Sequence, residues 1–371
     1  MTRNLLLILA FLHLPLLAAA TISVQLPPVT SPEFLISDTV LPATGKSNIE
    51  FRFTGNAVTD VGTLWTYHDK HQPPSSFTPH DARAALNEGA WLTARHGRWQ
   101  FTLGKGSREA YSGNQDAGQL WLDLHTSNPP ARQLSPQITK EQLDTTWCGV
   151  GYTIPWQTRG MHGACRFGTR LMQIDSLGLG AAIGTVANND YSGMVKLYTL
   201  TPGERGYGWC SDIQLTADAG PHWSFLLRDD GLAGQLVCRH VTVTDGFVTS
   251  PQIIQDADGF VHSIFGLSGA EWQHALTLNV KNTLDVGVTY RGPVVFTALV
   301  EHSEHENTPF FVLTWPCART LSFSAGFSPT HGVGTLGINT RYLRCYLSAD
   351  DWPSTSPRHL TVNLAVSPVV F

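Results

Sequence analysis

The segment Glu301-His302-Ser303-Glu304-His305-Glu306 holds the densest group of side chains that could do chemistry. Imidazoles and carboxylates are both good ligands for a divalent metal ion. The segment separates two strand-like runs, however, and a polar hairpin loop has this composition without any metal. We therefore predict no metal site, and name His302, His305, Glu301 and Glu304 as the weak candidates for one.

A second acidic pattern, Asp256-x-Asp258-Gly259, is half of a calcium-binding loop and lacks the later carboxylates of a complete one. A turn closed by Asp and Gly between two strands accounts for the same residues, and this is the preferred interpretation. The pattern also resembles the Asp-x-Asp-Gly turns of secreted β-propellers, which keeps a water-soluble alternative open.

No motif for covalent or phosphate chemistry is present. The chain has neither a Gly-x-Ser-x-Gly elbow nor a phosphate-binding glycine loop. A Ser/His pair that comes together only in the fold stays possible, but the sequence does not single one out. We predict no catalytic residue, no cofactor and no enzyme.

The six cysteines are Cys148, Cys165, Cys210, Cys238, Cys317 and Cys345. Several share the parity of apolar neighbours, as Cys345 does with Leu343 and Leu347, which is typical of free thiols that pack as small hydrophobes. An exported chain could instead oxidise some of them, so free thiols are the favoured prediction and at least one disulfide is the alternative.

The amino-terminal stretch indicates export. Arg3 precedes an apolar run from Leu5 to Leu17, and Ala18-Ala19-Ala20 forms a small-residue cleavage site, so residues 1–20 are predicted to be a signal peptide. No other stretch approaches the roughly 18–20 apolar residues of a membrane helix. If the mature chain enters a membrane, it must do so as a closed barrel.

Composition favours such a barrel. Charged residues make up 14% of the chain, with 34 glycines and 10% aromatic residues, whereas ordinary soluble domains are about a quarter charged. There is no basic run of the kind that follows a phosphate backbone, so nucleic acid is not expected as a partner.

Alternation of period two fills the carboxyl-terminal two thirds. In the last stretch Leu360, Val362, Leu364 and Val366 alternate with small or polar residues, as strand residues do when one face is apolar. Similar apolar rows begin at Trp99, Leu120, Val150, Leu177, Ile213, Leu276, Leu284 and Leu321. The opposite positions are largely Gly, Ser, Thr and Asn, whereas the outer face of a soluble sandwich carries Lys, Glu and Arg.

The fold predicted from these rows is an all-β transmembrane antiparallel barrel of about 12 to 14 strands. Residues 98–371 form the barrel domain, and residues 21–97 form an extended or plug region with a short helix. That helix is expected after Thr78-Pro79, over the run that ends at Gly89. A second helix is expected after Ser135-Pro136.

Several stretches resemble outer-membrane barrels related to the long-chain fatty-acid transporter FadL, including TraF-like and PorV-like relatives. They are GYGWCSDIQLTADAGPHWSFLL, LDVGVTYRGPVVFTALVEH, TLSFSAGFS, GVGTLGINTRYLRCYLSADD and HLTVNLAVSPVVF. The resemblance implies about fourteen strands, a plugged lumen, and either passage of hydrophobic molecules or a role in secretion and surface attachment. The amino-terminal plug pattern of the transporters is not recognisable here.

Two functions from different classes follow. The first is a bacterial outer-membrane barrel in contact with lipid, which acts as a passive conduit for a hydrophobic small molecule or as an envelope scaffold. The alternative is a secreted soluble β-propeller or sandwich that binds or cleaves polysaccharide. The sequence leaves the ligand and the oligomeric state open.

Overall fold

The computed structural model describes residues 22–27, 35, 47–59, 81–124, 131–187, 190–255, 261–303, 306–318, 320–330, 332–350 and 358–370. Nearly all of them belong to one sheet. Its strands are β1 (Ile22–Val24), β2 (Ser47–Thr59), β3 (Ala82–His96), β4 (Trp99–Gly113), β5 (Gln133–Leu134), β6 (Gln137–Thr158), β7 (Met161–Ala187), β8 (Asp190–Leu200), β9 (Gly206–Ala219), β10 (Trp223–Gln255), β11 (Val261–Val280), β12 (Thr283–Arg291), β13 (Val295–Ser303), β14 (Glu306–Ala318), β15 (Leu321–Ser328), β16 (Val333–Thr340), β17 (Leu343–Ala349) and β18 (His359–Val370). One helix, α4 (Gln115–Leu124), lies between β4 and β5.

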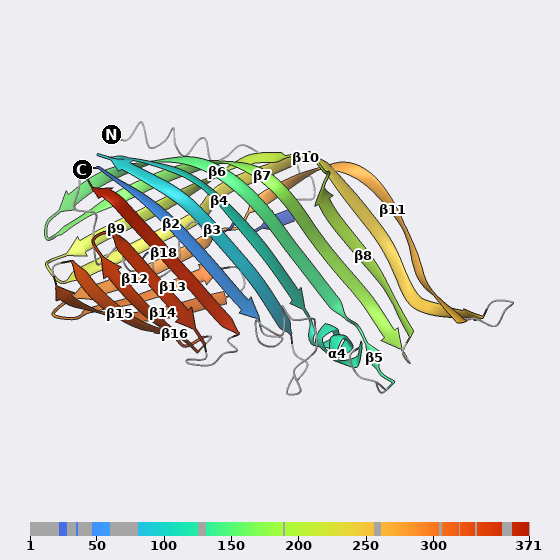
Figure 1. Ribbon diagram of the computed structural model, residues 1–371. Coiled ribbons are helices and arrows are strands. Elements are labelled where there is room, and N and C mark those ends of the chain that lie inside the picture. The colour runs from blue at the N-terminus through green and yellow to red at the C-terminus, as the bar shows by residue number, and fades with distance from the viewer. Residues whose placement is uncertain are drawn as a thin grey trace.

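The sheet closes into an antiparallel barrel of 14 strands. Strand β18 pairs with β2, and β9 pairs with β10, so the order returns to its start; Figure 1 shows red β18 beside blue β2. Three pairs of strands each count as one place in the wall, because both members bond to the same neighbour. Strands β5 and β6 both pair with β7, β8 and β9 also both pair with β7, and β11 and β12 both pair with β10. The strand number agrees with the prediction.

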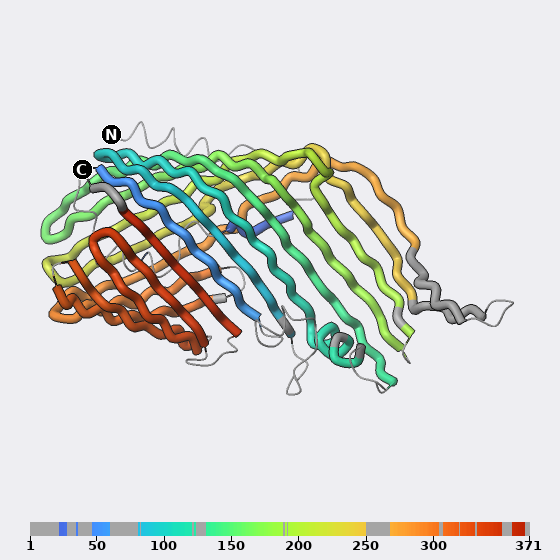
Figure 2. The backbone as a smooth tube through the Cα atoms, viewed as in Figure 1, coloured from blue at the N-terminus to red at the C-terminus, as the bar shows by residue number. Residues whose placement is uncertain are grey.

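The wall is much taller on one side than on the other. Strands β6, β7 and β10 have 22, 27 and 33 residues, whereas β15, β16 and β17 have 8, 8 and 7. Figure 2 shows the green, yellow and light-orange strands continuing beyond the red ones. We call the part of β7, β8, β10 and β11 that continues past the closed barrel the extension.

The predicted alternation is confirmed over most of the barrel. On β4 the side chains of Trp99, Phe101 and Leu103 are exposed on the outer face, while Gly104 faces the interior under Trp147. On β18, Val362 is exposed outside and Asn363 is fully buried inside. Small and polar residues therefore line the bore, and branched aliphatic and aromatic side chains form an outer band.

One predicted apolar row faces the other way. Leu177 and Leu179 of β7 were expected on the outward apolar row with Ala181 and Ile183, but both are buried in the interior cluster. The cause is a β-bulge: β6 pairs Thr145 with Ile174 and Asp144 with Ser176, which leaves Asp175 as an extra residue. An extra residue shifts a period-two pattern by one, so the apolar row moves to the inside.

Three predictions of local structure were wrong. Residues 82–89, expected as a helix, belong to β3, and the run after Ser135-Pro136 is β6; Thr78 and Pro79 lie outside the described residues. The row Leu120, Leu122 and Leu124, expected as a strand, lies in α4. In β3 and β6, pairing along 15 or more partners outweighs local helix propensity.

The domain boundary also moves. The strands β2 and β3 are parts of the wall, so the barrel starts at Ser47 and not at residue 98. A continuous cylinder likewise replaces the propeller or sandwich of the soluble alternative. The closed antiparallel barrel has the predicted number of strands. No helix in the described part of the chain has the length and apolar character needed to cross a bilayer.

Candidate functional site

The amino-terminal segment Ile22–Pro27 crosses the bore. Its strand β1 pairs in parallel with the end of β11, and the Lys281 amide donates to the Val24 carbonyl at 2.8 Å. The Gln25 amide then donates to Glu141 Oε1 of β6 at 2.9 Å. Pro27 lies against Gly106 so closely that an added Cβ there would be 2.6 Å from the proline ring. The segment Ile22–Pro27 therefore lies inside the barrel, in contact with β11, β6 and β4.

An apolar cluster surrounds this segment. Val24 is fully buried, and it packs with interior residues of the tall side of the wall: Leu143, Trp147, Ile174, Leu177, Leu236, Val241, Leu276 and Leu278. Deeper in the bore, Leu35 packs against Leu226, Leu299 and Val312. The inner face of the tall side is apolar because it covers the segment that lies in the lumen.

Above the segment lies a cavity of about 920 Å³. Its apolar wall includes Ile22, Leu26, Leu179, Tyr198, Val280 and Phe310, and its polar wall includes Arg108, Glu141, Lys196 and Asp230. The volume falls within the roughly 300–1,000 Å³ of small-molecule sites, which are mostly apolar with a few polar groups. We call this space the upper cavity.

The extension continues the apolar wall outward. Ile183 pairs with Met194, and Met194 pairs with Phe247, so the three side chains form a row across β7, β8 and β10. This row lies on the same face as Leu179 and Tyr198. Ile183 is an even number of residues from Leu179 on β7, and Met194 is an even number of residues from Tyr198 on β8. Their exposed fractions are 55%, 61% and 45%. An uncovered apolar row therefore leads from the extension into the upper cavity.

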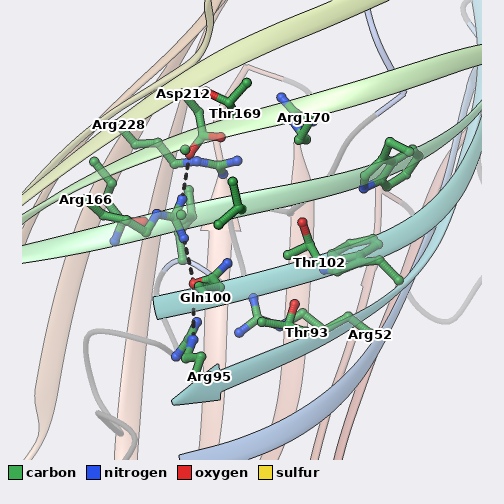
Figure 3. A pocket seen from close by; sticks show the side chains of 17 residues that line it. Arg52, Thr93, Arg95, Gln100, Thr102, Arg166, Thr169, Arg170, Asp212 and Arg228 are labelled. Carbon is green, nitrogen blue, oxygen red and sulfur yellow. Dashed lines mark hydrogen bonds and ion pairs between the residues drawn. The ribbon is translucent and has the colours of Figure 1, made fainter. Parts of the chain in front are cut away.

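Below the upper cavity, arginines and carboxylates fill the bore. Arg166 donates from Nη2 to Asp212 at 2.9 Å and from Nη1 to Gln100 at 3.2 Å, and Gln100 also accepts from Arg95 at 3.3 Å. Figure 3 shows this chain of side chains running across neighbouring strands. It borders a cavity of about 70 Å³, the lower cavity.

A second network adjoins the first. Asp230 accepts from both Arg170 and Arg228, the latter at 2.9 Å, and Arg228 lies 3.8 Å from Asp285. On the other side of the bore Glu50 binds both Arg52 and Arg344. Each pair joins residues of one strand, of adjacent strands or of two strands that flank a common neighbour, so together they line the lower bore with fixed charged groups.

The structure separates the candidate metal ligands. Glu301 is half-buried on the inner face of β13 and lines the upper cavity, whereas the neighbouring His302 is exposed, with its Nδ1 2.6 Å from Asn307 Oδ1. Adjacent strand residues point to opposite faces, so these two side chains do not converge. Glu304 and His305 lie outside the described residues, as do Asp256, Asp258 and Gly259.

The sequence analysis did not identify the arginine cluster. Its signal was available as charged residues at inward positions of otherwise apolar strands, such as Arg52 between Phe51 and Phe53. What the alternation could not show is which of these arginines meet, since Arg170 and Arg228 come from β7 and β10. The six cysteines are all free, as favoured, and Cys210 Sγ accepts from Arg170 at 3.0 Å.

The fold and the bore define a class of protein: a closed β-barrel with its amino-terminal segment in the lumen and a cavity above it that has an apolar wall and a polar wall. No family model and no curated protein sequence matches the chain. Among solved structures, the chain is similar to a TodX monoaromatic hydrocarbon channel mutant lacking S2 and S3, at 12% identity and TM-score 0.47, covering 91% of this chain and 94% of that one.

Two further structures are similar. The toluene transporter TodX of P. putida shares 10% identity at TM-score 0.43, with 89% of this chain and 91% of that chain covered. The CymD monoaromatic hydrocarbon channel shares 10% identity at TM-score 0.22, with 91% and 92% covered.

Proposed function

We propose that the chain is an outer-membrane barrel that acts as a passive conduit for small hydrophobic molecules. The upper cavity carries this proposal, because it is enclosed by the barrel, has an apolar wall and continues into the exposed row of Ile183, Met194 and Phe247. A ligand that leaves water loses exposed apolar area at each step along this path. No residue is assigned a catalytic step.

The outer surface supports a position in a bilayer. Exposed aliphatic and aromatic side chains cover the outer faces of the short strands, and Trp99, Trp223 and Trp315 lie on that face near the tight turns. The connections at the turn end are short, whereas those at the other end include α4 and the residues between β2 and β3. Bacterial outer-membrane barrels combine a lipid-facing band, aromatic girdles, short periplasmic turns and longer outer loops.

In this position the extension lies on the extracellular side. On the outer face of β4 the apolar residues end at Leu103, and Lys105, Ser107 and Glu109 follow. Thr146 and Asp144 of β6 lie beside Lys105 and Ser107. Polar outer positions at one height on two strands mark the upper limit of the lipid-facing band. Export through the signal peptide of residues 1–20 belongs to this proposal.

The lower bore makes passage conditional. The cavity of about 70 Å³ among the arginines and Asp212 has room for a few water molecules and is too small for an aromatic hydrocarbon. A ligand in the upper cavity therefore advances only when the segment Ile22–Pro27 or the arginine cluster moves. The proposed conduit is selective for small apolar molecules and closed at rest.

The test fills the upper cavity. Ala181 lines it, and Ala182 is the next residue on β7 with its side chain on the opposite face. We expect Ala181→Trp to weaken binding of the apolar dye N-phenyl-1-naphthylamine to the purified barrel and to slow uptake of toluene by whole cells that carry the barrel in their outer membrane. Ala182→Trp is the matched control and should leave both unchanged.

Equal dye binding and uptake by both variants would reject the conduit. Recovery of the full chain from the soluble periplasm without detergent would reject the membrane position as well. Heat-modifiable migration on a gel after mild detergent extraction is the result expected of an intact barrel.

The scaffold role remains a second candidate because of the edge of β11. In the described residues β11 pairs with β10 along its length, and its other edge pairs with β1 only at Leu278–Val280. The residues from Gly269 to Ala275 are exposed. An exposed strand edge can accept a strand of another chain. A barrel with no solute uptake and a stably bound envelope protein would favour the scaffold.

A further inference from the structure

Three buried donors meet at the lower cavity. Arg166, Arg170 and Arg228 all line it, and in each the Nε–H finds no acceptor among the described residues. Arg170 and Arg228 are buried to more than nine tenths. An unsatisfied buried N–H is costly, so a site with three of them requires an acceptor.

The terminal nitrogens of these arginines are already committed. Arg166 uses both Nη atoms for Gln100 and Asp212, Arg170 uses Nη2 for Asp230 and Cys210, and Arg228 uses Nη2 for Asp230 and places Nη1 3.8 Å from Asp285. The carboxylates therefore hold the guanidinium groups in place, and the Nε–H groups are left to bind something else.

The charge of the lining decides the kind of acceptor. Among the described residues, five arginines border the lower cavity, namely Arg52, Arg95, Arg166, Arg170 and Arg228, and Asp212 is the carboxylate that borders it. Asp212 is held by Arg166 at 2.9 Å, so its charge is matched. Such a lining attracts a negative ion, and N–H donors of charged groups bind anions more strongly than they bind neutral acceptors.

We propose that the lower cavity is a binding site for one small anion, such as a halide or a carboxylate group. The volume of about 70 Å³ accepts such an ion with a water molecule and excludes an aromatic hydrocarbon. The anion bridges β7, which carries Arg166 and Arg170, to β10, which carries Arg228. It completes the polar closure of the lower bore.

The first experiment uses the full chain purified in detergent, with bromide as the probe. Sodium bromide at constant ionic strength, balanced with sodium gluconate, should raise the melting temperature with a saturable dependence. Crystals grown in bromide should show an anomalous peak within hydrogen-bond distance of at least two of the three Nε atoms. Equal melting in both salts together with no peak there would overturn the site.

Arginine-to-lysine variants separate the site from general salt effects. Arg170→Lys and Arg228→Lys keep the charge and remove the Nε–H, so each should raise the half-saturating bromide concentration about tenfold or more. Arg291→Lys is the control, because Arg291 pairs with Asp218 at 3.1 Å and does not border the lower cavity. Equal bromide dependence in all three variants would also overturn the proposal, and the wild-type diffraction result covers a variant that fails to fold.

Competition identifies the source of the anion. Displacement of bromide by octanoate but not by acetate would assign the site to the acidic group of a longer ligand. Displacement by acetate and chloride alike would assign it to free ions. Dye binding in the upper cavity is a separate measurement, so failure of the anion site leaves the conduit standing, and the reverse also holds.

Discussion

The short and tall sides of the barrel have similar outer faces near the tight turns and very different inner faces. Inside the short side, hydroxyl and amide groups pair across strands: Thr289 with Thr297 at 3.0 Å, Thr314 with Ser324 at 2.9 Å, and Thr335 with Ser348 at 2.8 Å. Inside the tall side, aliphatic residues and tryptophans surround the amino-terminal segment, and arginines pair with carboxylates.

The comparison shows that the residues of the outer face suit the medium outside the barrel, which is the same for both sides. The residues of the inner face suit what lies in the bore next to them, which differs between the two sides. On the short side neutral pairs predominate, and Arg344 of β17 adds a charged pair with Glu50 of β2. Where the wall meets the amino-terminal segment, it needs apolar surface to cover that segment and charges to close the bore beneath it. The tall side is therefore where the cavities lie and where passage is controlled.

The largest expected effect comes from a variant that breaks the network of ion pairs inside the tall side. Arg228→Met removes the cation between Asp230 and Asp285, both of which lie inside the bore. Loss of one partner from a buried charge network costs about 3–5 kcal/mol. Urea unfolding of the barrel in lipid vesicles should show this loss, and adding Asp285→Asn should recover part of it. A double variant no more stable than Arg228→Met would contradict the pairing.

An intermediate effect tests how far the tall side projects from the membrane. Phe167 is exposed on the outer face of β7, whereas Ser176 lies on that face beside Asp144, at the polar level. Lysine in place of Phe167 should cost up to about 2–4 kcal/mol, since a cation near the bilayer midplane is unfavourable, and in place of Ser176 under about 1 kcal/mol. Similar losses in vesicle-based unfolding would mean that the band does not end where we place it.

The smallest effect addresses the short side. The Tyr346 hydroxyl donates to Asn339 Oδ1 at 2.6 Å, and both residues are buried. Tyr346→Phe removes the hydroxyl that donates to the buried Asn339 Oδ1, and it should lower the free energy of unfolding by about 1–2 kcal/mol. Tyr342→Phe, at an exposed turn residue, is the control and should change it little. A loss as large as that of Arg228→Met would show that both sides depend equally on polar pairing.

Much of the fold followed from alternation, and the errors have identifiable causes. The outer rows on β4 and β18 were correct because the period is exactly two wherever pairing is regular. The row at Leu177 and Leu179 was misplaced because Asp175 interrupts the register. The segment 82–89 reads as a helix locally, but the edges of β2 and β4 on both sides make it a strand.

The sequence by itself determined which faces are apolar, roughly how many strands there are, and that the opposite faces are small or polar. Those properties repeat every second residue, so they can be read directly from the amino-acid sequence. Only the tertiary structure decided that the amino-terminal segment occupies the bore, that Arg170 and Arg228 share Asp230, and that two cavities form. These depend on which strands become neighbours in the closed wall, as β7 and β10 do on either side of β9, and barrel closure sets that by joining residues far apart in the chain.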